Sequence, residues 1–479
     1  MDQKLLVGMS QKDITPPARV SLQGQFHTRI SEYVESPLLA NVFAAESAGD
    51  QIVICACDLV GIGLDFANTV RVKIRERCPD LDADKVIFSA THTHTGPEFY
   101  RVEKSLHVAA KFLPEEIKFV DYEKIPDDVW MQDKCGPFIA DRLCEAVCEA
   151  WEKRQPGQIS PSFGRAVVGH CRRVVYDDAS AKMYGSTDTV NFEALEGGND
   201  SGIELLYVFD AANKPVGALA NVACPSQCVE GEYYISSDYW GKARDKVKAQ
   251  LGDDFILVGL CGAGGDQSPR DLVRRNAKKQ RRTDPNMYGL EGAIELGGRV
   301  AQVVLDKLES AAAEPSGQAV IAHEVLSIDF PLRRVTISEY DNAKRQFMDY
   351  VRSNPKTTYD SRDMSALHIH GGIMERYEKQ QTVQFYTSEI HVARIGDIAI
   401  TTNPFELFLD YGNKIKAMSE ATQTFVIQLA CDTAGYLPTA KAECGSHYSA
   451  YVSSGKTGHD GGELLVRKTL DTIQKLWQE

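Results

Sequence analysis

The sequence predicts a mixed α/β protein in which helices flank mixed β-sheets. Short apolar runs typical of buried strands alternate along the chain with amphipathic helical patterns. No fixed-period repeat and no low-complexity linker interrupts this alternation. We therefore expect one continuous unit over residues 1–479 rather than two separate domains.

The predicted strands are apolar runs bounded by turn residues, at 52–59, 86–90, 203–209, 216–223, 255–260, 389–395, 398–402 and 425–429. The predicted helices have apolar residues three or four positions apart, at 67–77, 139–151, from 239 onward, and at 293–308, 338–351, 405–418 and 462–477. The first two strands and the helix between them have the spacing of a βαβ unit. The pair at 203–209 and 216–223 predicts a hairpin.

Two segments lack such patterns. The charged stretch at 99–133 predicts an excursion over the surface. The stretch at 355–380 predicts a loosely structured lid or insertion, because loops of that length usually serve one of those purposes.

Composition narrows the class of protein. The formal net charge of −14 argues against nucleic acid as a partner, because phosphate neutralisation needs a broad basic face. No apolar run is long enough for a membrane span, and the first residues lack the pattern of an export signal. We expect a cytoplasmic protein with free thiols at its twelve scattered cysteines and with a small soluble molecule as its partner. A homo-oligomer is compatible with the sequence.

The junction Thr91-His92-Thr93-His94-Thr95-Gly96-Pro97 directly follows a predicted strand. Two imidazoles at i and i+2 on an extended backbone point to the same side, so that one can bind a cation while the other faces the ligand of that cation. A pair of half-buried structural histidines would give the same pattern.

Four other predicted strands also end in small and polar residues, where sites in α/β proteins are built. The Gly-rich turn after 255–260 carries Asp266, Ser268 and Arg270, and it could equally be a capped turn. The other candidates after these strands are Cys224, Gln227, Asp238, Glu406, Tyr436 and Tyr448. Structural roles would also explain most of them: Cys224 as a packed thiol, Asp238 as a helix N-cap, Glu406 as a carboxylate in the first turn of a helix, and the tyrosines as packing residues.

Together, the motifs resemble the neutral ceramidases and their bacterial relatives over most of the chain. They are DITPP at 13–17, the segment at 24–46, THTHTGP at 91–97, GDQSP at 265–269, NPFE at 403–406 and GYLPT at 435–439. The resemblance implies a zinc ion that activates water for amide hydrolysis. It further implies His92, Glu406 and Tyr436 as metal ligands, His94 and Tyr448 as residues facing the substrate carbonyl, and Ser268 as a catalytic residue.

The sequence departs from this family where a second zinc-binding histidine is expected. The corresponding stretch, NVACPSQC at 221–228, has none. Cys224 as an additional donor would suit zinc, whereas Gln227 or Asp238 would favour a harder divalent metal, and loss of the metal is a third alternative. The chain also ends too soon after Trp477 for the immunoglobulin-like domain of true ceramidases, so we expect none.

These observations lead to a metal-dependent hydrolase of a soluble amide, ester or glycan-linked substrate. We expect catalysis by His94, Ser268 and Tyr448, and a metal, zinc or another divalent ion, on His92, Glu406, Tyr436 and Cys224. The expected substrate contacts are Gln227, Asp238, Asp266, Arg270 and His370, with His368 nearby and the basic residues at 270–282 at the rim.

Two alternatives stay open: a carbohydrate-active enzyme with other chemistry, and a ligand-binding protein on a ceramidase-like scaffold. Ceramide itself is expected to be a poor substrate, a substituted sugar a better one. Because each follows the end of a predicted strand, His92, Ser268, Glu406 and Tyr436 should converge in one pocket although they lie far apart in the sequence.

Overall fold

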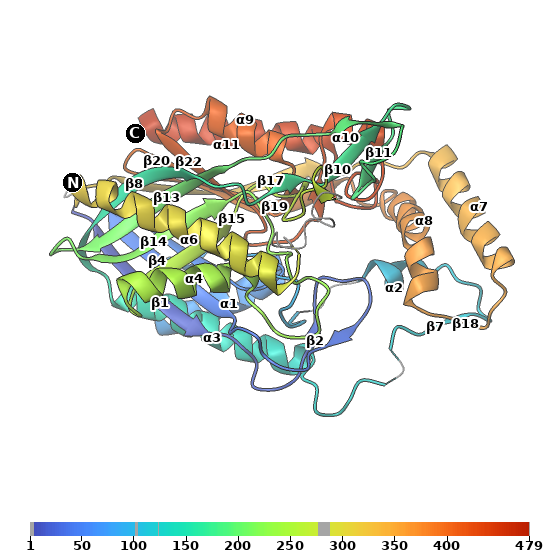
Figure 1. Cartoon of the computed structure of the whole chain (residues 1–479), viewed down its shortest axis with the longest axis horizontal. Helices are drawn as coiled ribbons and strands as arrows, with labels where there is room; N and C mark the ends of the chain where they lie inside the picture. Colours follow the sequence, from blue (N-terminus) through green and yellow to red (C-terminus); the bar gives the residue numbers. More distant parts are fainter. Residues whose placement is uncertain (1–3, 101–103, 123, 276–287, 479) are drawn as a thin grey trace.

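Two β-sheets with helices packed on their outer faces form the body of the structure (Figure 1). A computed structural model describes residues 4–100, 104–122, 124–275 and 288–478. The larger sheet has eight strands in the order β15-β14-β13-β8-β1-β4-β5-β6. Their bounds are β1 Leu6–Asp13, β4 Leu39–Ser47, β5 Asp50–Cys57, β6 Val86–Ala90, β8 Gln155–Arg165, β13 Gly202–Asp210, β14 Pro215–Val222 and β15 Ile256–Cys261.

Neighbouring strands of this sheet are antiparallel except for β5 with β6 and β14 with β15. The predicted βαβ unit and the predicted hairpin are therefore confirmed. The sheet curls, because β15 at one end lies close to β4, β5 and β6 at the other. A second sheet in the order β17-β19-β20-β22 consists of β17 Ile321–Pro331, β19 Phe385–Ile395, β20 Ile398–Thr402 and β22 Gln423–Ile427.

A central apolar core lies between the inner faces of the two sheets. Phe43 of β4, Leu206 of β13 and Ile400 of β20 pack there in one buried cluster. Alternate residues of the same strands point outward, as the period of two in a strand requires. On β5, for example, Ile54 faces the central core and Cys55 faces the helices outside.

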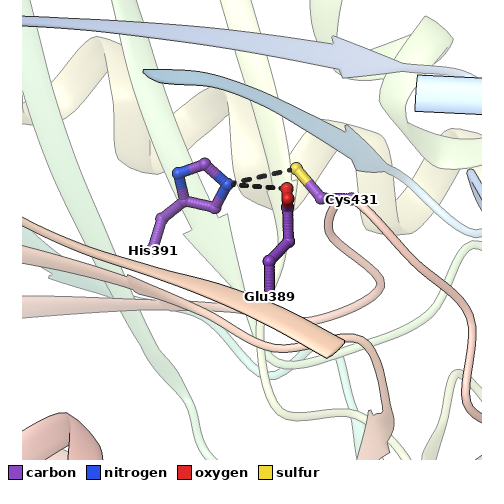
Figure 2. A group of neighbouring side chains, drawn as sticks. All are labelled: Glu389, His391 and Cys431. Carbon is purple, nitrogen blue, oxygen red and sulfur yellow. Dashed lines mark hydrogen bonds and ion pairs between the residues drawn. The ribbon is translucent and has the colours of Figure 1, made fainter. Parts of the chain in front are cut away.

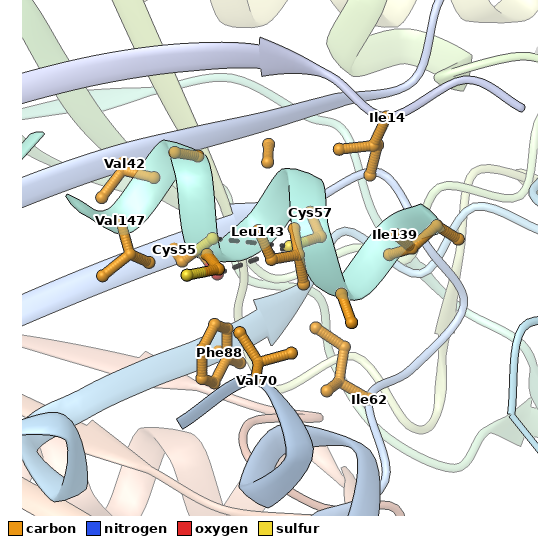
Figure 3. Packing of buried hydrophobic residues seen from close by; sticks show 14 of the residues in the cluster. Ile14, Val42, Cys55, Cys57, Ile62, Val70, Phe88, Ile139, Leu143 and Val147 are labelled. Carbon is orange, nitrogen blue, oxygen red and sulfur yellow. Dashed lines mark hydrogen bonds between the residues drawn. The ribbon is translucent and has the colours of Figure 1, made fainter. Parts of the chain in front are cut away.

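Helices cover three outer faces. Helices α1 and α3 pack on β4, β5 and β6, where Val70, Phe88 and Leu143 meet in one cluster (Figure 3). Helices α4 and α6 cover β13 and β14, and helices α9 and α11 cover the second sheet. The bounds are α1 Leu64–Arg77, α3 Gln132–Glu152, α4 Asp238–Leu251, α6 Leu290–Ala313, α9 Leu409–Met418 and α11 His459–Gln478. None of the described helices is long and apolar enough to cross a membrane.

The prediction of a loose segment at 355–380 was wrong. It contains β18 Thr358–Tyr359 and helix α8 Ser361–Lys379, which a capping box of Asp360 and Asp363 starts. Within this helix Gly371 is a packing position, since an added Cβ would lie 2.5 Å from the Cα of Ala109. Helix α8 shares a small core with α2 Ser105–Ala110 and α7 Ile337–Ser353 at one end of the molecule (Figure 1).

The stretch at 99–133 is largely irregular, as expected, but it carries α2 and the short strand β7 Lys118–Phe119. The helix predicted at 405–418 begins only at Leu409, because Glu406–Leu407 forms β21 and pairs with β23 Tyr436–Leu437. The other short elements are β2 Ser21–Leu22, β3 Arg29–Ile30, η1 Ala83–Lys85, β9 His170–Cys171, β10 Arg173–Tyr176, β11 Ala181–Met183, β12 Phe192–Leu195, β16 Gln267–Ser268 and α10 Ala440–Gly445.

The contact between β1 and α3 generates a prediction about stability. A Cβ added at Gly8 would lie 2.0 Å from the carbonyl oxygen of Ala150, a backbone atom that cannot move aside alone. We expect Gly8→Ala to lower the free energy of unfolding by about 1–3 kcal/mol in chemical denaturation. Gly198→Ala is the control, because no heavy atom lies within 4 Å of its added Cβ. Equal stability of the two variants would contradict this packing.

Candidate active site

The segments that follow β6, β14, β15, β20 and β22 meet at one end of the central core. Gly265 donates a backbone hydrogen bond to Leu407, and Ser226 donates one to Thr91. Glu406 pairs with Tyr436 in the short parallel ladder of β21 and β23. These contacts link the segments after β15, β20 and β22 to one another, and they link the segment after β14 to the one that carries the two histidines.

The loop after β6 holds both imidazoles in place. His92 has a left-handed backbone (φ 65°), so the strand has already turned there rather than continuing extended. The hydroxyls of Thr93 and Thr95 both donate to the carbonyl of Ser236. The two rings nevertheless face each other, with 3.2 Å between the Nε2 atoms of His92 and His94.

A buried guanidinium fixes the orientation of the neighbouring amide. Arg172 can only donate hydrogen bonds, so the Gln227 oxygen, 3.2 Å from its Nη1, must be the acceptor. The Gln227 amide nitrogen then faces His94 and donates to its Nε2 at 2.9 Å. This leaves the His94 proton on Nδ1, which lies 3.7 Å from the carboxylate of Glu230.

His92 is oriented by the backbone in the same way. Its Nδ1 lies 2.6 Å from the carbonyl oxygen of Val60, so Nδ1 carries the proton and donates. The Nε2 lone pair then faces the Glu406 carboxylate at 3.5 Å and the Nε2 lone pair of His94. His94 Nε2 already accepts from Gln227, so His92 Nε2 and the Glu406 carboxylate are the two acceptors left facing each other, and together they could bind a metal ion.

The Glu406 and Tyr436 side chains complete this group. Burial alone would raise the pKa of Glu406. His92, Arg172 and the Tyr436 hydroxyl stabilise the carboxylate, however, and their combined effect lowers the pKa. Burial, with Glu406 and Tyr448 nearby, raises the pKa of Tyr436 well above its usual range. The Arg172 Nη2 lies 3.4 Å from the Tyr436 hydroxyl and 3.9 Å from a Glu406 oxygen. Without a metal, Arg172 therefore balances Glu406 and Tyr436 stays a neutral phenol.

Tyr448 connects this group to a cavity of about 880 Å³. Its ring is 5.4 Å from that of Tyr436 and 5.6 Å from that of Phe26. Burial raises the pKa of Tyr448 to about 12, so its hydroxyl is a donor at neutral pH. Helix α8 lines the other side of the cavity with His368, Ile369, Gly372, Glu375, Arg376 and Lys379.

Ser268 lies on the far side of Arg172. Its hydroxyl oxygen accepts a hydrogen bond from Tyr184 at 3.3 Å and one from the Arg270 backbone N–H at 3.1 Å. The Arg270 side chain donates to Glu230 at 2.9 Å and stacks on Tyr288. Lys278, Lys279, Arg281 and Arg282 of the expected basic rim lie outside the described residues.

The structure thus brings together His92, His94, Gln227, Glu406, Tyr436 and Tyr448, with Ser268 linked through Tyr184 and Arg172. The Cys224 thiol lies apart and contacts the carbonyls of Val168 and Pro225. The first turn of α4 contains Asp238, which accepts from the N–H of Val229, and Asp266 accepts from the N–H of Leu409. His370 lies on α8 but is not among the residues that line the cavity.

Three residues of the site were missed in the sequence. Arg172, Glu230 and Tyr184 lie in irregular stretches, and only the charge of Arg172 within an apolar run could have marked it. Arg172 is 2 % exposed, and a buried arginine needs several acceptors around it. Its partners come from four different loops, which the sequence does not reveal.

A second group of metal-binding residue types lies elsewhere in the described part of the chain. Glu389, His391 and Cys431 each offer one donor atom, and the three atoms lie within 4.8 Å of one another. Around His92, the described residues form no comparable group of three from His, Cys, Asp and Glu, because the third donor there is the Tyr436 phenol.

Comparison with solved structures supports the fold class. A ceramidase described as complexed with C2 superimposes with a TM-score of 0.70 at 16% identity, and the match covers 99% of this chain and 75% of that one. The neutral ceramidase from Pseudomonas aeruginosa gives 0.69 at 17% identity with the same coverage. No protein-family model matches the sequence. No curated protein matches it either. The chain therefore has a ceramidase-like fold, and the mixed α/β prediction is confirmed.

The loop that carries Tyr448 generates a prediction about a buried ion pair. Arg173 holds both oxygens of Glu196, at 2.6 and 3.0 Å, and also donates to the carbonyls of Ser446 and Tyr448. We expect Arg173→Ala to cost about 3–5 kcal/mol of unfolding free energy, because the Glu196 carboxylate stays buried without its partner.

The double variant Arg173→Met with Glu196→Leu should cost clearly less than the two single changes added together. Chemical denaturation of the three variants measures this coupling. Strictly additive losses would show that the pair does not hold the loop.

Proposed function

We propose that this protein is a metal-dependent hydrolase of a small soluble amide, ester or glycan-linked substrate. One observation carries the proposal. The Nε2 lone pair of His92 faces the Glu406 carboxylate, and a divalent cation between them would take both groups as ligands. The Tyr436 phenol beside Glu406 supplies a further oxygen donor.

These residues fit a catalytic divalent cation. His92 donates its other ring proton to a backbone carbonyl, as histidines that bind metals usually do. One imidazole, one carboxylate and one phenol give three protein donors, the number typical of catalytic zinc sites. A bound divalent ion would polarise the substrate carbonyl and lower the pKa of a water molecule. Cys224 takes no part in this donor set.

His94 is the residue best placed to move a proton. Burial lowers its pKa well below the usual range, and His92, Arg29 and Arg172 lower it further, so the ring is neutral. It could therefore accept a proton at Nε2 once the attacking water replaces the Gln227 amide as the donor to that atom. Glu230 near Nδ1 would stabilise the imidazolium that forms, and the proton can then be passed to the leaving group.

Two hydroxyls are suited to stabilising the substrate. Tyr448 borders both the cavity and Tyr436, where its O–H can donate to the oxygen that gains charge during hydrolysis. Ser268 accepts two hydrogen bonds, from Tyr184 and from the Arg270 N–H. Its own hydroxyl proton would position water or a polar group of the substrate.

The cavity supports a polar, anionic or hydroxylated substrate. Arg376 donates to the backbone carbonyl oxygens of Arg333, Gly455 and Lys456. These carbonyl groups carry no full negative charge, so they do not neutralise the guanidinium. Burial, with Arg376 and Lys379 close by, lowers the pKa of Lys456. An anionic group of the substrate at this wall would relieve that repulsion. A substituted sugar acid or an N-acyl amino acid has suitable chemistry.

The metal is tested by removing its imidazole donor. We expect wild-type protein reconstituted with zinc to hold an ion at His92, and His92→Ala to lose one equivalent of zinc and at least about 10²-fold in hydrolytic rate. His107→Ala, on the exposed side of α2, is the matched control and should keep both. Equal zinc content in the His92→Ala and control proteins would contradict the proposed ligand.

The substrate class is tested by a hydrolysis screen of N-acyl amino acids, acylated sugars, neutral esters and long-chain ceramide. Turnover should be confined to the soluble compounds. Lys456→Gln should raise the KM of anionic substrates about fivefold to tenfold, the effect of roughly 1 kcal/mol, and leave neutral ones unchanged. Lys414→Gln is the control, because Lys414 pairs with the exposed Glu463. Efficient turnover of long-chain ceramide would refute this substrate class.

A further inference from the structure

Glu389, His391 and Cys431 form a buried cluster at the junction of the two sheets, separate from the proposed active site. Glu389 and His391 alternate on β19 and point to the same side, and Cys431 follows β22 with a left-handed backbone (φ 60°). Figure 2 shows the three side chains directed at one another. His391 Nε2 lies 3.1 Å from a Glu389 oxygen and 3.5 Å from the Cys431 sulfur.

A chain of hydrogen bonds fixes which ring nitrogen of His391 carries its proton. His323 Nδ1 lies 3.2 Å from the carbonyl oxygen of Gln51, which can only accept, so Nδ1 holds the His323 proton. The Nε2 of His323 is then an acceptor and faces His391 Nδ1 at 2.9 Å. The His391 proton therefore lies on Nδ1, and its Nε2 lone pair points at the carboxylate and the sulfur.

The carboxylate offers no proton to this lone pair. Arg71 donates to both Glu389 oxygens, at 2.6 and 3.0 Å. An imidazole lone pair and a carboxylate oxygen 3.1 Å apart repel each other, and either the weak S–H donor of Cys431 or a cation between the donor atoms would relieve this repulsion.

The spacing of the donors matches a tetrahedral zinc ion. Zinc-to-ligand bonds of about 2.0–2.3 Å place tetrahedral nitrogen and oxygen donors about 3.4 Å apart, and nitrogen and sulfur donors about 3.6 Å apart. The corresponding distances here are 3.1 and 3.5 Å. Each donor also has the supporting contact that metal ligands usually show. His391 donates to His323, Glu389 accepts from Arg71, and the Cys431 sulfur accepts from the Phe88 N–H at 3.4 Å.

We propose that Glu389, His391 and Cys431 bind a thiophilic divalent cation, of which zinc is the best match. On binding, the Cys431 thiol releases its proton to solvent and the sulfur coordinates as thiolate. The two anionic ligands neutralise the ion, and Arg71 retains its single positive charge.

The ion would join three parts of the fold. The Cys431 N–H donates to the Phe88 carbonyl of the edge strand β6, and its sulfur accepts from the Phe88 N–H. Glu389 and His391 belong to β19, and Arg71 comes from α1. Asp432, the next residue, lines the cavity, and Tyr436 of the proposed active site follows four positions later. The proposed role is therefore structural: the ion would hold the segment that positions Tyr436.

The test uses the full chain with the exposed Cys444 replaced by serine, so that this thiol cannot bind metal. Protein reconstituted with Co²⁺ and freed of excess metal should show a near-ultraviolet thiolate-to-cobalt charge-transfer band. Cys431→Ser in this background should abolish the band and lose one equivalent of metal by elemental analysis. His92→Ala should retain the band, because it removes only the proposed active-site ligand.

A band of equal intensity in the Cys431→Ser protein, or no band in its parent, would overturn the proposal. If Cys431→Ser does not fold, Glu389→Gln replaces it, because loss of the carboxylate should weaken cobalt binding at least tenfold while the thiol is kept. Unchanged cobalt affinity in Glu389→Gln would also overturn the proposal. Neither outcome depends on hydrolytic activity, so the two metal sites are tested independently.

Discussion

The geometry of the candidate site depends on the buried guanidinium of Arg172. A guanidinium only donates, so it determines which end of the Gln227 amide faces it and hence which nitrogen of His94 holds the proton. The same group donates to the Gly265 carbonyl at 2.8 Å and lies beside Glu406 and Tyr436. Its charge also helps to balance the buried Glu406 carboxylate.

The fold explains why residues from distant parts of the chain meet around Arg172. The eight-stranded sheet curls until β15 approaches β4, β5 and β6, and the four-stranded sheet closes the third side of the central core. Several strands therefore end near one another, although β6 and β15 are the two edges of their sheet. Each loop contributes only one or two side chains to the site. The residues of the site therefore occur in the sequence as short motifs separated by long segments of strand and helix.

Much of this arrangement could be predicted from the sequence. Strand and helix positions followed from apolar periodicity, and the loop with His92 and His94 followed from its position after a strand. The register of Glu406 against Tyr436 could not be predicted, because a two-residue strand has too few positions to show alternation. Helix α8 was missed although Asp360 and Asp363 form a capping box at its start, and its Gly371 allows close packing on Ala109.

The position of the expected second zinc-binding histidine is the clearest case in which the sequence did not predict the structure. Cys224 was the chemically plausible replacement, but the loop after β14 turns its thiol toward Val168 and brings Gln227 to His94 instead. Side-chain direction in a loop depends on backbone torsions that residue type alone does not determine. For the same reason Arg172, which lies between two short strands, gave no recognisable signal.

The central claim is that a metal cation lies between His92 Nε2, the Glu406 carboxylate and the Tyr436 phenol. The most direct measurement is an anomalous-difference map from a crystal of the full chain reconstituted with zinc, recorded on both sides of the zinc absorption edge. The account predicts an edge-dependent peak about 2.0–2.2 Å from donor atoms of all three residues. The absence of an edge-dependent peak at this position would contradict it.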